Sequence, residues 1–159
     1  MMDLVERDTV YVCGWAVETD AGGNDRDIGA LYADFFGGDK HTLARGLAGD
    51  RPGWFGLTWY TDNHERYRYL LGVEVGAHTR PPVGALAKTL PPTRWAVASY
   101  PAGQDIMEAW SQFYFTDIPQ AGWAPDDAYN FYFEYYPTDV HADFQLWVPV
   151  VPVAQCPPP

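Results

Sequence analysis

The order of the secondary-structure elements expected from this sequence occurs twice, and this repeat is the strongest constraint on the fold. In each half, a run of β-branched and aromatic residues predicts a strand. A helical spacing of apolar residues then predicts a helix, and two further runs predict two strands joined by a turn. The predicted strands cover residues 9–17, 54–60 and 67–75 in one half and 94–100, 130–136 and 143–150 in the other. The predicted helices carry apolar faces at Ile28, Leu31, Tyr32 and Phe35 and at Ile106, Ala109, Trp110, Phe113 and Tyr114. The order β-α-β-β in both halves predicts an α+β fold with antiparallel sheets.

The last two strands of each half also match in length. Residues 58–75 and 133–150 align without a gap at an offset of 75, which places Leu71 on Leu146 and Val75 on Val150. The alternative is two ordinary hairpins of similar size, but equal lengths favour an internal duplication. Two βαββ units would form a central ligand cleft at their pseudo-twofold axis. In this register Trp59 corresponds to Glu134, and we expect the two side chains to face each other across the cleft.

Length and composition indicate how the chain is organised. With 159 residues, of which 16% are aromatic, it can bury a substantial core, and we expect residues 1–150 to form a single domain. The repeat halves span about 8–76 and 93–150, with residues 77–92 as a linker whose role stays open. The Pro-rich residues 151–159 are expected to form a flexible tail, because proline neither continues a helix nor pairs in a central strand.

Charge and cysteine content exclude several classes of function. The 10 basic and 21 acidic residues give a formal net charge of −11, which repels phosphate backbones and excludes direct binding of nucleic acid. No apolar run is long enough to span a membrane, and the first residues do not resemble a secretory signal. Cys13 and Cys156 form neither a disulfide framework nor a zinc motif. We therefore expect a cytoplasmic protein without a metal site.

Glu134 is the only acidic residue in an aromatic run that otherwise predicts a buried strand, Tyr-Asn-Phe-Tyr-Phe-Glu-Tyr-Tyr at 129–136. Burial favours the neutral form of a carboxyl group and raises its pKa, so such a residue commonly serves a ligand or a reaction. The alternative is that strand alternation points it at water. Tyr132 and Tyr136 share its face at a period of two and surround it with aromatic rings, which favours a functional role.

Three segments resemble the hallmark sequences of the GyrI-like (gyrase-inhibitor-like) small-molecule-binding domain. They are Phe-Glu-Tyr-Tyr at 133–136, Leu-Trp-Val-Pro-Val at 146–150 and Ile-Pro-Gln-Ala-Gly-Trp at 118–123. The resemblance implies a duplicated βαββ fold in which the acid at position 134 lies in a central aromatic cleft and contacts cationic or polar ligands. It also implies an effector-binding or multidrug-binding domain of bacterial type, here as a stand-alone member.

The primary functional prediction is binding of a hydrophobic aromatic or cationic small molecule, for sequestration or sensing. Aromatic rings attract cations by about 0.5–2 kcal/mol each, and a carboxylate fixes the position of the charge. Trp110 and Phe113 are expected to be core residues of their helix. The predicted ligand-binding residues are Glu134, Trp59, Tyr132, Tyr136, Trp147, Trp123, Trp95, Trp15 and Tyr114.

Two alternative functions stay open. The first is a cofactor-free hydrolase, since the resemblance extends to enzymes that open cyclopropane-bearing genotoxic natural products. Glu134 would then be the general base, with Tyr132 or Tyr136 orienting water, and no cofactor would be required. The second is a protein-interaction role such as gyrase inhibition, which an acidic surface allows although no motif marks it.

Overall fold

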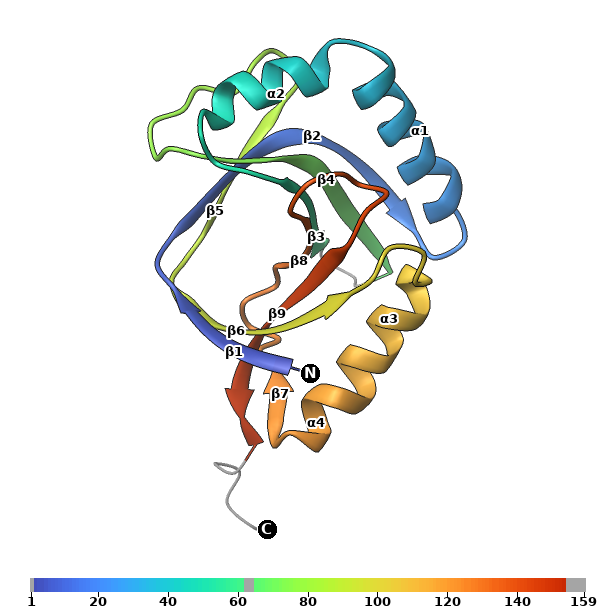
Figure 1. Ribbon diagram of the computed structural model, residues 1–159, viewed down its shortest axis with the longest axis vertical. Coiled ribbons are helices and arrows are strands. Elements are labelled where there is room, and N and C mark those ends of the chain that lie inside the picture. Colours follow the sequence, from blue (N-terminus) through green and yellow to red (C-terminus); the bar gives the residue numbers. More distant parts are fainter. Residues whose placement is uncertain (1, 62–64, 154–159) are drawn as a thin grey trace.

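The computed structural model describes residues 2–61 and 65–153 (Figure 1). Its strands are β1 (Met2–Arg7), β2 (Val10–Asp20), β3 (Trp54–Tyr60), β4 (Arg66–Val75), β5 (Leu86–Leu90), β6 (Thr93–Tyr100), β7 (Trp123–Pro125), β8 (Tyr132–Tyr136) and β9 (Phe144–Pro152). Its helices are α1 (Asn24–Gly37), α2 (Lys40–Ala48), α3 (Ile106–Gln112), the π-helix η1 (Phe113–Asp117) and α4 (Ile118–Gln120). The predicted α+β class is confirmed.

One strongly curved antiparallel sheet joins the two halves (Figure 1). Its order is β1-β6-β9-β8-β3-β4-β2-β5, with β7 pairing with β9 at the side. The order is symmetric about the β3–β8 pair, so β2, β3 and β4 correspond to β6, β8 and β9. This confirms the predicted duplication of antiparallel βαββ units about a pseudo-twofold axis. Gly56 and Glu134 are direct cross-strand partners at this central junction.

The outermost strands are exchanged between the halves. β1, which precedes the first half in the sequence, pairs with β6 of the second half. β5, which precedes the second half, pairs with β2 of the first half. Neither strand was predicted from the sequence, and residues 86–90 were expected to belong to a linker. Edge strands bury only part of their side chains, so their apolar patterns are weak.

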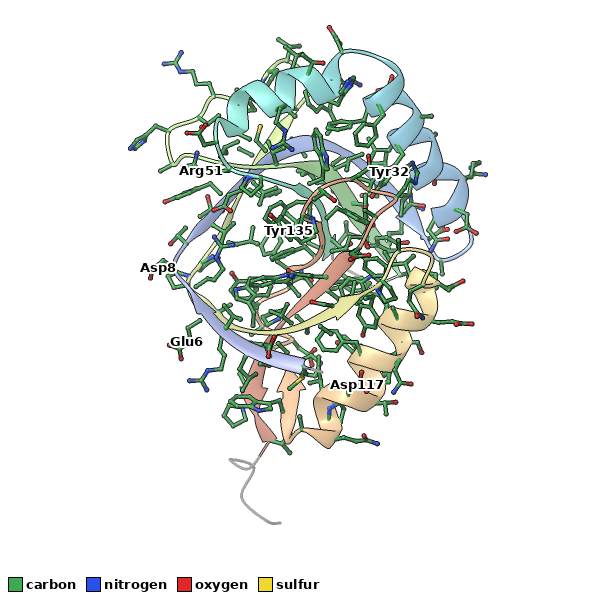
Figure 2. All side chains as sticks on the ribbon, in the orientation of Figure 1. Glu6, Asp8, Tyr32, Arg51, Asp117 and Tyr135 are labelled. Carbon is green, nitrogen blue, oxygen red and sulfur yellow. The ribbon has the colours of Figure 1, made fainter. Side chains whose placement is uncertain are left out.

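The helices cover the convex face of the sheet, whereas side chains of the strands fill its concave face (Figures 1 and 2). Leu31 and Phe35 lie one helical turn apart on α1 and pack on the first half of the sheet. Phe113 packs in the same way on the second half. Burying a side chain of this size contributes about 1.5–3 kcal/mol. The concave core contains Trp95 and Phe133, whose ring centroids are 5.0 Å apart.

The predicted register of the duplication is wrong by three residues. Leu71 pairs with Gly56 in the first hairpin, whereas its counterpart Leu146 pairs with Glu134 in the second. The two residues of the pair are therefore 15 positions apart in one hairpin and 12 in the other. An ungapped alignment cannot represent this difference. Glu134 thus corresponds to Gly56 and not to Trp59.

Two smaller predictions also differ from the structure. The predicted helix, whose apolar face ends at Tyr114, continues to Gln120, because η1 and α4 extend it. Residues 151 and 152, predicted as the start of the tail, are the end of β9 and pair with β7. Residues 154–159 of that tail, Cys156 among them, lie outside the described residues. No helix in the described ranges is long and apolar enough to cross a membrane.

Candidate ligand-binding cleft

A cleft of about 830 Å³ lies on the convex face between α1 and α3, over the junction of β3 and β8. Helices cover the sheet on both sides of this junction, and the cleft is the space between the two helical layers. Its lining includes Ile28, Thr58, Tyr60, Tyr67, Tyr69, Ile106, Met107, Trp110, Tyr114, Phe115, Tyr132 and Glu134. The cleft therefore lies on the pseudo-twofold axis, as the duplication predicts.

Strand alternation explains why polar and aromatic side chains meet at the floor. Thr58 and Tyr132 are cross-strand partners, as are Gly56 and Glu134, and partners in an antiparallel pair share a face. Tyr69 on β4 points to the same face and reaches Glu134. Gly56 lacks a side chain at the centre of this floor. The space it leaves is occupied by the carboxylate of Glu134 and the hydroxyl of Tyr69.

Glu134 is buried, with 8% of its surface exposed, and it accepts several hydrogen bonds. The hydroxyl of Tyr69 donates to its Oε1 atom, and the Tyr136 hydroxyl donates to the same atom at 3.1 Å. The indole Nε1 of Trp110 donates to Oε2 at 3.3 Å. An indole N–H is only a donor. These contacts suit an ionised carboxylate, which is only an acceptor.

Glu134 sets the direction of the hydrogen bond between Tyr32 of α1 and Tyr69. The hydroxyl oxygens of Tyr32 and Tyr69 are 2.6 Å apart. Because the Tyr69 hydroxyl has one hydrogen and donates it to Glu134, the hydrogen between the two tyrosines belongs to Tyr32. Figure 2 shows Tyr32 on the side of α1 that faces the sheet. A chain of donors thus runs from the helix to the carboxylate.

Burial and hydrogen bonding act in opposite directions on Glu134. Burial raises its pKa above 4.5, the ordinary value of a glutamate, and hydrogen bonds from Tyr69, Trp110 and Tyr136 lower the pKa in part. Burial, followed by the charge of Glu134, raises the pKa of Tyr69 and of Tyr136. Both tyrosines therefore keep their protons and remain donors at neutral pH.

The charged residues that line the cleft are acidic. They are Asp25 and Glu134, and no lysine, arginine or histidine of the described residues lines it. None of the ion pairs in the described ranges includes Glu134. The described residues also contain no group of three or more potential metal ligands. The site is thus an aromatic cleft with a buried carboxylate that lacks a cationic partner among the described side chains.

The helical wall on the side of α3 is apolar and partly exposed. The side chain of Asp105 caps α3 by accepting a hydrogen bond from the Glu108 backbone N–H. The π-helical segment then widens the helix, and Tyr114 and Phe115 both line the cleft although they are adjacent in sequence. Phe115 is 73% exposed and Met107 is 59% exposed. These two side chains form an apolar rim at the mouth of the cleft.

The structure brings part of the predicted residue set together. Glu134, Tyr132 and Tyr114 line the cleft, and Tyr136 donates to Glu134. The expectation that Trp59 faces Glu134 is wrong, because Trp59 belongs to the opposite face of β3. Its ring packs in the concave core and lies 4.7 Å from Lys88 Nζ.

The other predicted tryptophans also lie outside the cleft. Trp95 and Trp147 pack in the concave core, with ring centroids 6.1 Å apart. Trp15 packs against Phe35 under α1, and Trp123 lies on β7 near Arg94. Rings at these positions stabilise the fold around the cleft.

Two side chains that contact Glu134 were not predicted from the sequence to do so. Tyr69 lies among the apolar residues of β4, and the sequence of this strand does not show which face of the sheet the Tyr69 side chain occupies. Trp110 was predicted to be a core residue; it packs against the buried core of the second half, but it is only half-buried, lines the cleft and donates to Glu134. The same prediction for Phe113 is confirmed. An aromatic residue on the apolar face of a helix can line a cleft when the helix lies at its edge.

The family of the chain follows from a match along nearly its whole length. Residues 3–150 match the model of the Cass2 family, described as an integron-associated effector binding protein. The chain belongs to the Cass2 family. Membership of this effector-binding family supports the predicted role of the Cass2 domain in small-molecule binding and confirms the GyrI-like resemblance. No curated protein matches the chain at a significant level.

Solved structures share the Cass2 fold at low sequence identity. SAV2435 bound to tetraphenylphosphonium is 12% identical with a TM-score of 0.77, over 95% of this chain and 94% of that protein. An integron cassette protein of Vibrio cholerae is 16% identical with a TM-score of 0.69, over 94% and 95%. A putative transcription regulation protein of Staphylococcus aureus is 16% identical with a TM-score of 0.68, over 94% and 97%. These TM-scores establish the common fold.

If the cleft binds an organic cation, replacing Tyr32 by phenylalanine should weaken that binding mainly at low pH. The change removes the hydroxyl that donates to Tyr69, and through it some of the hydrogen bonding that lowers the pKa of Glu134. We expect affinity for tetraphenylphosphonium to fall about threefold to tenfold at acidic pH and to recover at higher pH. Titration calorimetry across a pH series measures this. Tyr100→Phe is the control, because its buried hydroxyl lies outside the cleft. Equal pH profiles for the wild type and Tyr32→Phe would contradict the donor chain.

Proposed function

We propose that this protein binds hydrophobic organic cations in the cleft, with Glu134 as the counter-charge. The observation that carries the proposal is a carboxylate that is 8% exposed, lies at the floor of an aromatic cleft and has neutral donors as its partners among the described residues. An unpaired charge in such a place destabilises the empty protein. A bound cation removes much of this cost, so the site favours positively charged ligands over neutral ligands of the same shape.

The size and lining of the cleft suit a compact aromatic ligand. Pockets for small molecules commonly measure about 300–1,000 Å³, and the cleft has about 830 Å³. The ring centroids of Trp110 and Tyr132 are 5.2 Å apart, and the two ring planes meet at 69°. Together these rings form one wall of the cleft. Their faces attract a delocalised cation, and the apolar rim at Met107 and Phe115 adds contact area. Apolar contacts do not require one particular hydrogen-bond pattern, so they favour binding of a range of ligands. Sequestration or sensing of diverse compounds requires such a range.

The complex of SAV2435 with tetraphenylphosphonium supports this choice of ligand class and provides a probe. Calorimetric titration of the full chain with tetraphenylphosphonium should give saturable binding at a single site. Triphenylphosphine oxide, which is neutral and carries similar rings, should bind more weakly. Absence of binding at millimolar tetraphenylphosphonium, with the protein folded by circular dichroism, would overturn the proposal.

The affinity for a cation should depend on pH through the ionisation of Glu134. Burial raises the pKa of Glu134 above 4.5 in the free protein, and a cation binds the ionised form. As pH falls through this raised pKa, protons compete with the ligand, and affinity should decrease about tenfold for each further pH unit. Above the pKa the affinity should be constant. Titrations in buffers of matched ionic strength measure the profile, and binding of triphenylphosphine oxide should lack this decrease. A flat profile for the cation would contradict the counter-charge role.

A further inference from the structure

A second cavity of about 450 Å³ adjoins the cleft. The side chains of Tyr60, Tyr114 and Tyr132 line both spaces and form a shared aromatic wall. Beyond this wall the second cavity is bounded by the loop that follows β7 and by β9, with Asp126 and Asp127 on the loop. A ligand that fills the cleft therefore has a neighbouring space into which it can extend.

The loop that bounds the second cavity is held firmly against the sheet. The side chain of Asn130 accepts a hydrogen bond from the backbone N–H of Tyr60 at 3.1 Å and donates one to the Tyr60 carbonyl at 3.0 Å. It does so with a positive φ of 57°, a conformation that asparagine tolerates better than most residues. At the other end of the loop, the backbone N–H of Asp126 donates to the Pro149 carbonyl at 2.7 Å. The second cavity is thus a fixed part of the fold.

The charges at the second cavity are acidic and lack ion-pair partners within the described ranges. Neither Asp126 nor Asp127 forms an ion pair there, and no basic residue of that part of the chain lines the cavity. By contrast, Glu18 on β2 pairs with Arg66. Asp127 and Tyr114 both line the second cavity; burial raises the pKa of Tyr114, and the negative charge of Asp127 adds to this increase.

The two acidic sites are separated by a length that one elongated molecule can span. Asn130 precedes Glu134 by four residues, or roughly 13 Å of extended chain, and the acidic loop lies at that end of the wall. The path between the sites passes the three shared tyrosines. Their rings suit an apolar linker or a quaternary ammonium group.

We propose that the second cavity is a subsite for a second positive group, so that the preferred ligands are elongated dications with one charge at Glu134 and the other at Asp126 and Asp127. This inference rests on the proposed function, since it requires the first charge to bind at Glu134. It extends that function by naming the ligand class as two cationic groups joined by an apolar linker.

The test compares two ammonium ions with the same linker. Decamethonium carries a trimethylammonium group at each end of a decamethylene chain, and decyltrimethylammonium carries one. Decamethonium should bind at least about fivefold more tightly, which exceeds the roughly twofold statistical advantage of two equal ends. The double variant Asp126→Asn/Asp127→Asn should remove this advantage and leave affinity for decyltrimethylammonium within about twofold. Asparagine at 126 can still accept the hydrogen bond from the Ala128 backbone N–H.

A matched control changes the net charge equally at another place. Asp139 and Asp143 also accept hydrogen bonds from backbone N–H groups, and neither lines the two cavities. The variant Asp139→Asn/Asp143→Asn should keep the advantage of decamethonium, which supports a local effect of Asp126 and Asp127. If the control variant also lost the advantage of decamethonium, that advantage would be an effect of net charge, and the subsite would be wrong.

The remaining outcomes separate this inference from the proposed function. If cations bind but decamethonium has no advantage, or keeps it in the Asp126/Asp127 variant, the subsite is wrong and the role of Glu134 stands. The same holds if tetraphenylphosphonium binds and neither ammonium ion does. If none of the three cations binds, the proposed function and the subsite both fail.

Discussion

Replacing Glu134 by glutamine should lower the affinity for tetraphenylphosphonium by about 30-fold or more, because a cation in the cleft then loses its buried counter-charge. Glutamine keeps the size of the side chain and one acceptor oxygen, so the cleft retains its shape. Affinity for neutral triphenylphosphine oxide should change by less than about threefold. Calorimetric titration of both ligands against both proteins gives the comparison.

The control for this change is Glu108→Gln on α3. Glu108 is exposed, carries the same charge and does not line the cleft, so its replacement should leave both affinities unchanged. An equal loss in both variants would indicate a general effect of net charge. Unchanged affinity of Glu134→Gln for the cation would contradict the central role of this carboxylate.

The Glu134→Gln variant also distinguishes binding from hydrolysis. Hydrolysis by this protein stays a prediction. A general base must be ionised and must reach a water molecule, and Glu134 instead accepts hydrogen bonds from Tyr69, Tyr136 and Trp110. If the protein hydrolyses cyclopropane-bearing compounds, Glu134→Gln should retain binding of the neutral compound and lose turnover. Product analysis by mass spectrometry after incubation with wild type and variant separates the two roles.

Replacing Gly56 by alanine should weaken cation binding at least about tenfold and lower the free energy of unfolding by about 1–3 kcal/mol. A Cβ atom at this position would lie 2.1 Å from the hydroxyl oxygen of Tyr69 and 2.6 Å from Oε1 of Glu134. Both side chains are buried and hydrogen-bonded to each other, so they can move only by breaking that contact. Calorimetry and denaturant unfolding measure the two effects.

Gly46→Ala is the matched control for Gly56→Ala. A Cβ atom at Gly46, which lies in α2, has no neighbour within 4 Å, so this change should preserve ligand affinity. It should also stabilise the helix slightly, because alanine has the higher helix propensity. Wild-type affinity in Gly56→Ala would show that the floor of the cleft tolerates a methyl group and that the tight packing around Glu134 is not required.

The main elements of this fold can be predicted from the sequence because each has one clearly apolar face. Ile28, Leu31 and Phe35 recur at helical spacing, and α1 forms where they predict it. The short strands β1, β5 and β7 could not be predicted in this way. Their side chains are partly exposed, and the strands form because another strand offers unpaired backbone groups.

The alternation of side chains along one strand predicts only part of the cleft. A period of two places Glu134, Tyr132 and Tyr136 on one face, which is correct, but it does not reveal which residues of other strands share that face. That depends on the pairing register, and the three-residue difference between the hairpins shifted the expected partner from Gly56 to Trp59. Gly56 has no side chain that an alignment could match to Glu134. The lack of a side chain at Gly56 is nevertheless what leaves room for the carboxylate.

The exchanged outer strands affect how the chain can acquire this fold during synthesis. Leu4 of β1 pairs with Ala96 of β6, so β1 leaves the ribosome long before its partner strand exists. Contacts between residues so distant in sequence form slowly because a large loop must close first. β5 pairs with β2 across a similarly long interval and completes the first half only after its hairpin has been made. The Cass2 domain should therefore fold and unfold as one cooperative unit, and a nascent first half should expose an unpaired strand edge for chaperones to protect.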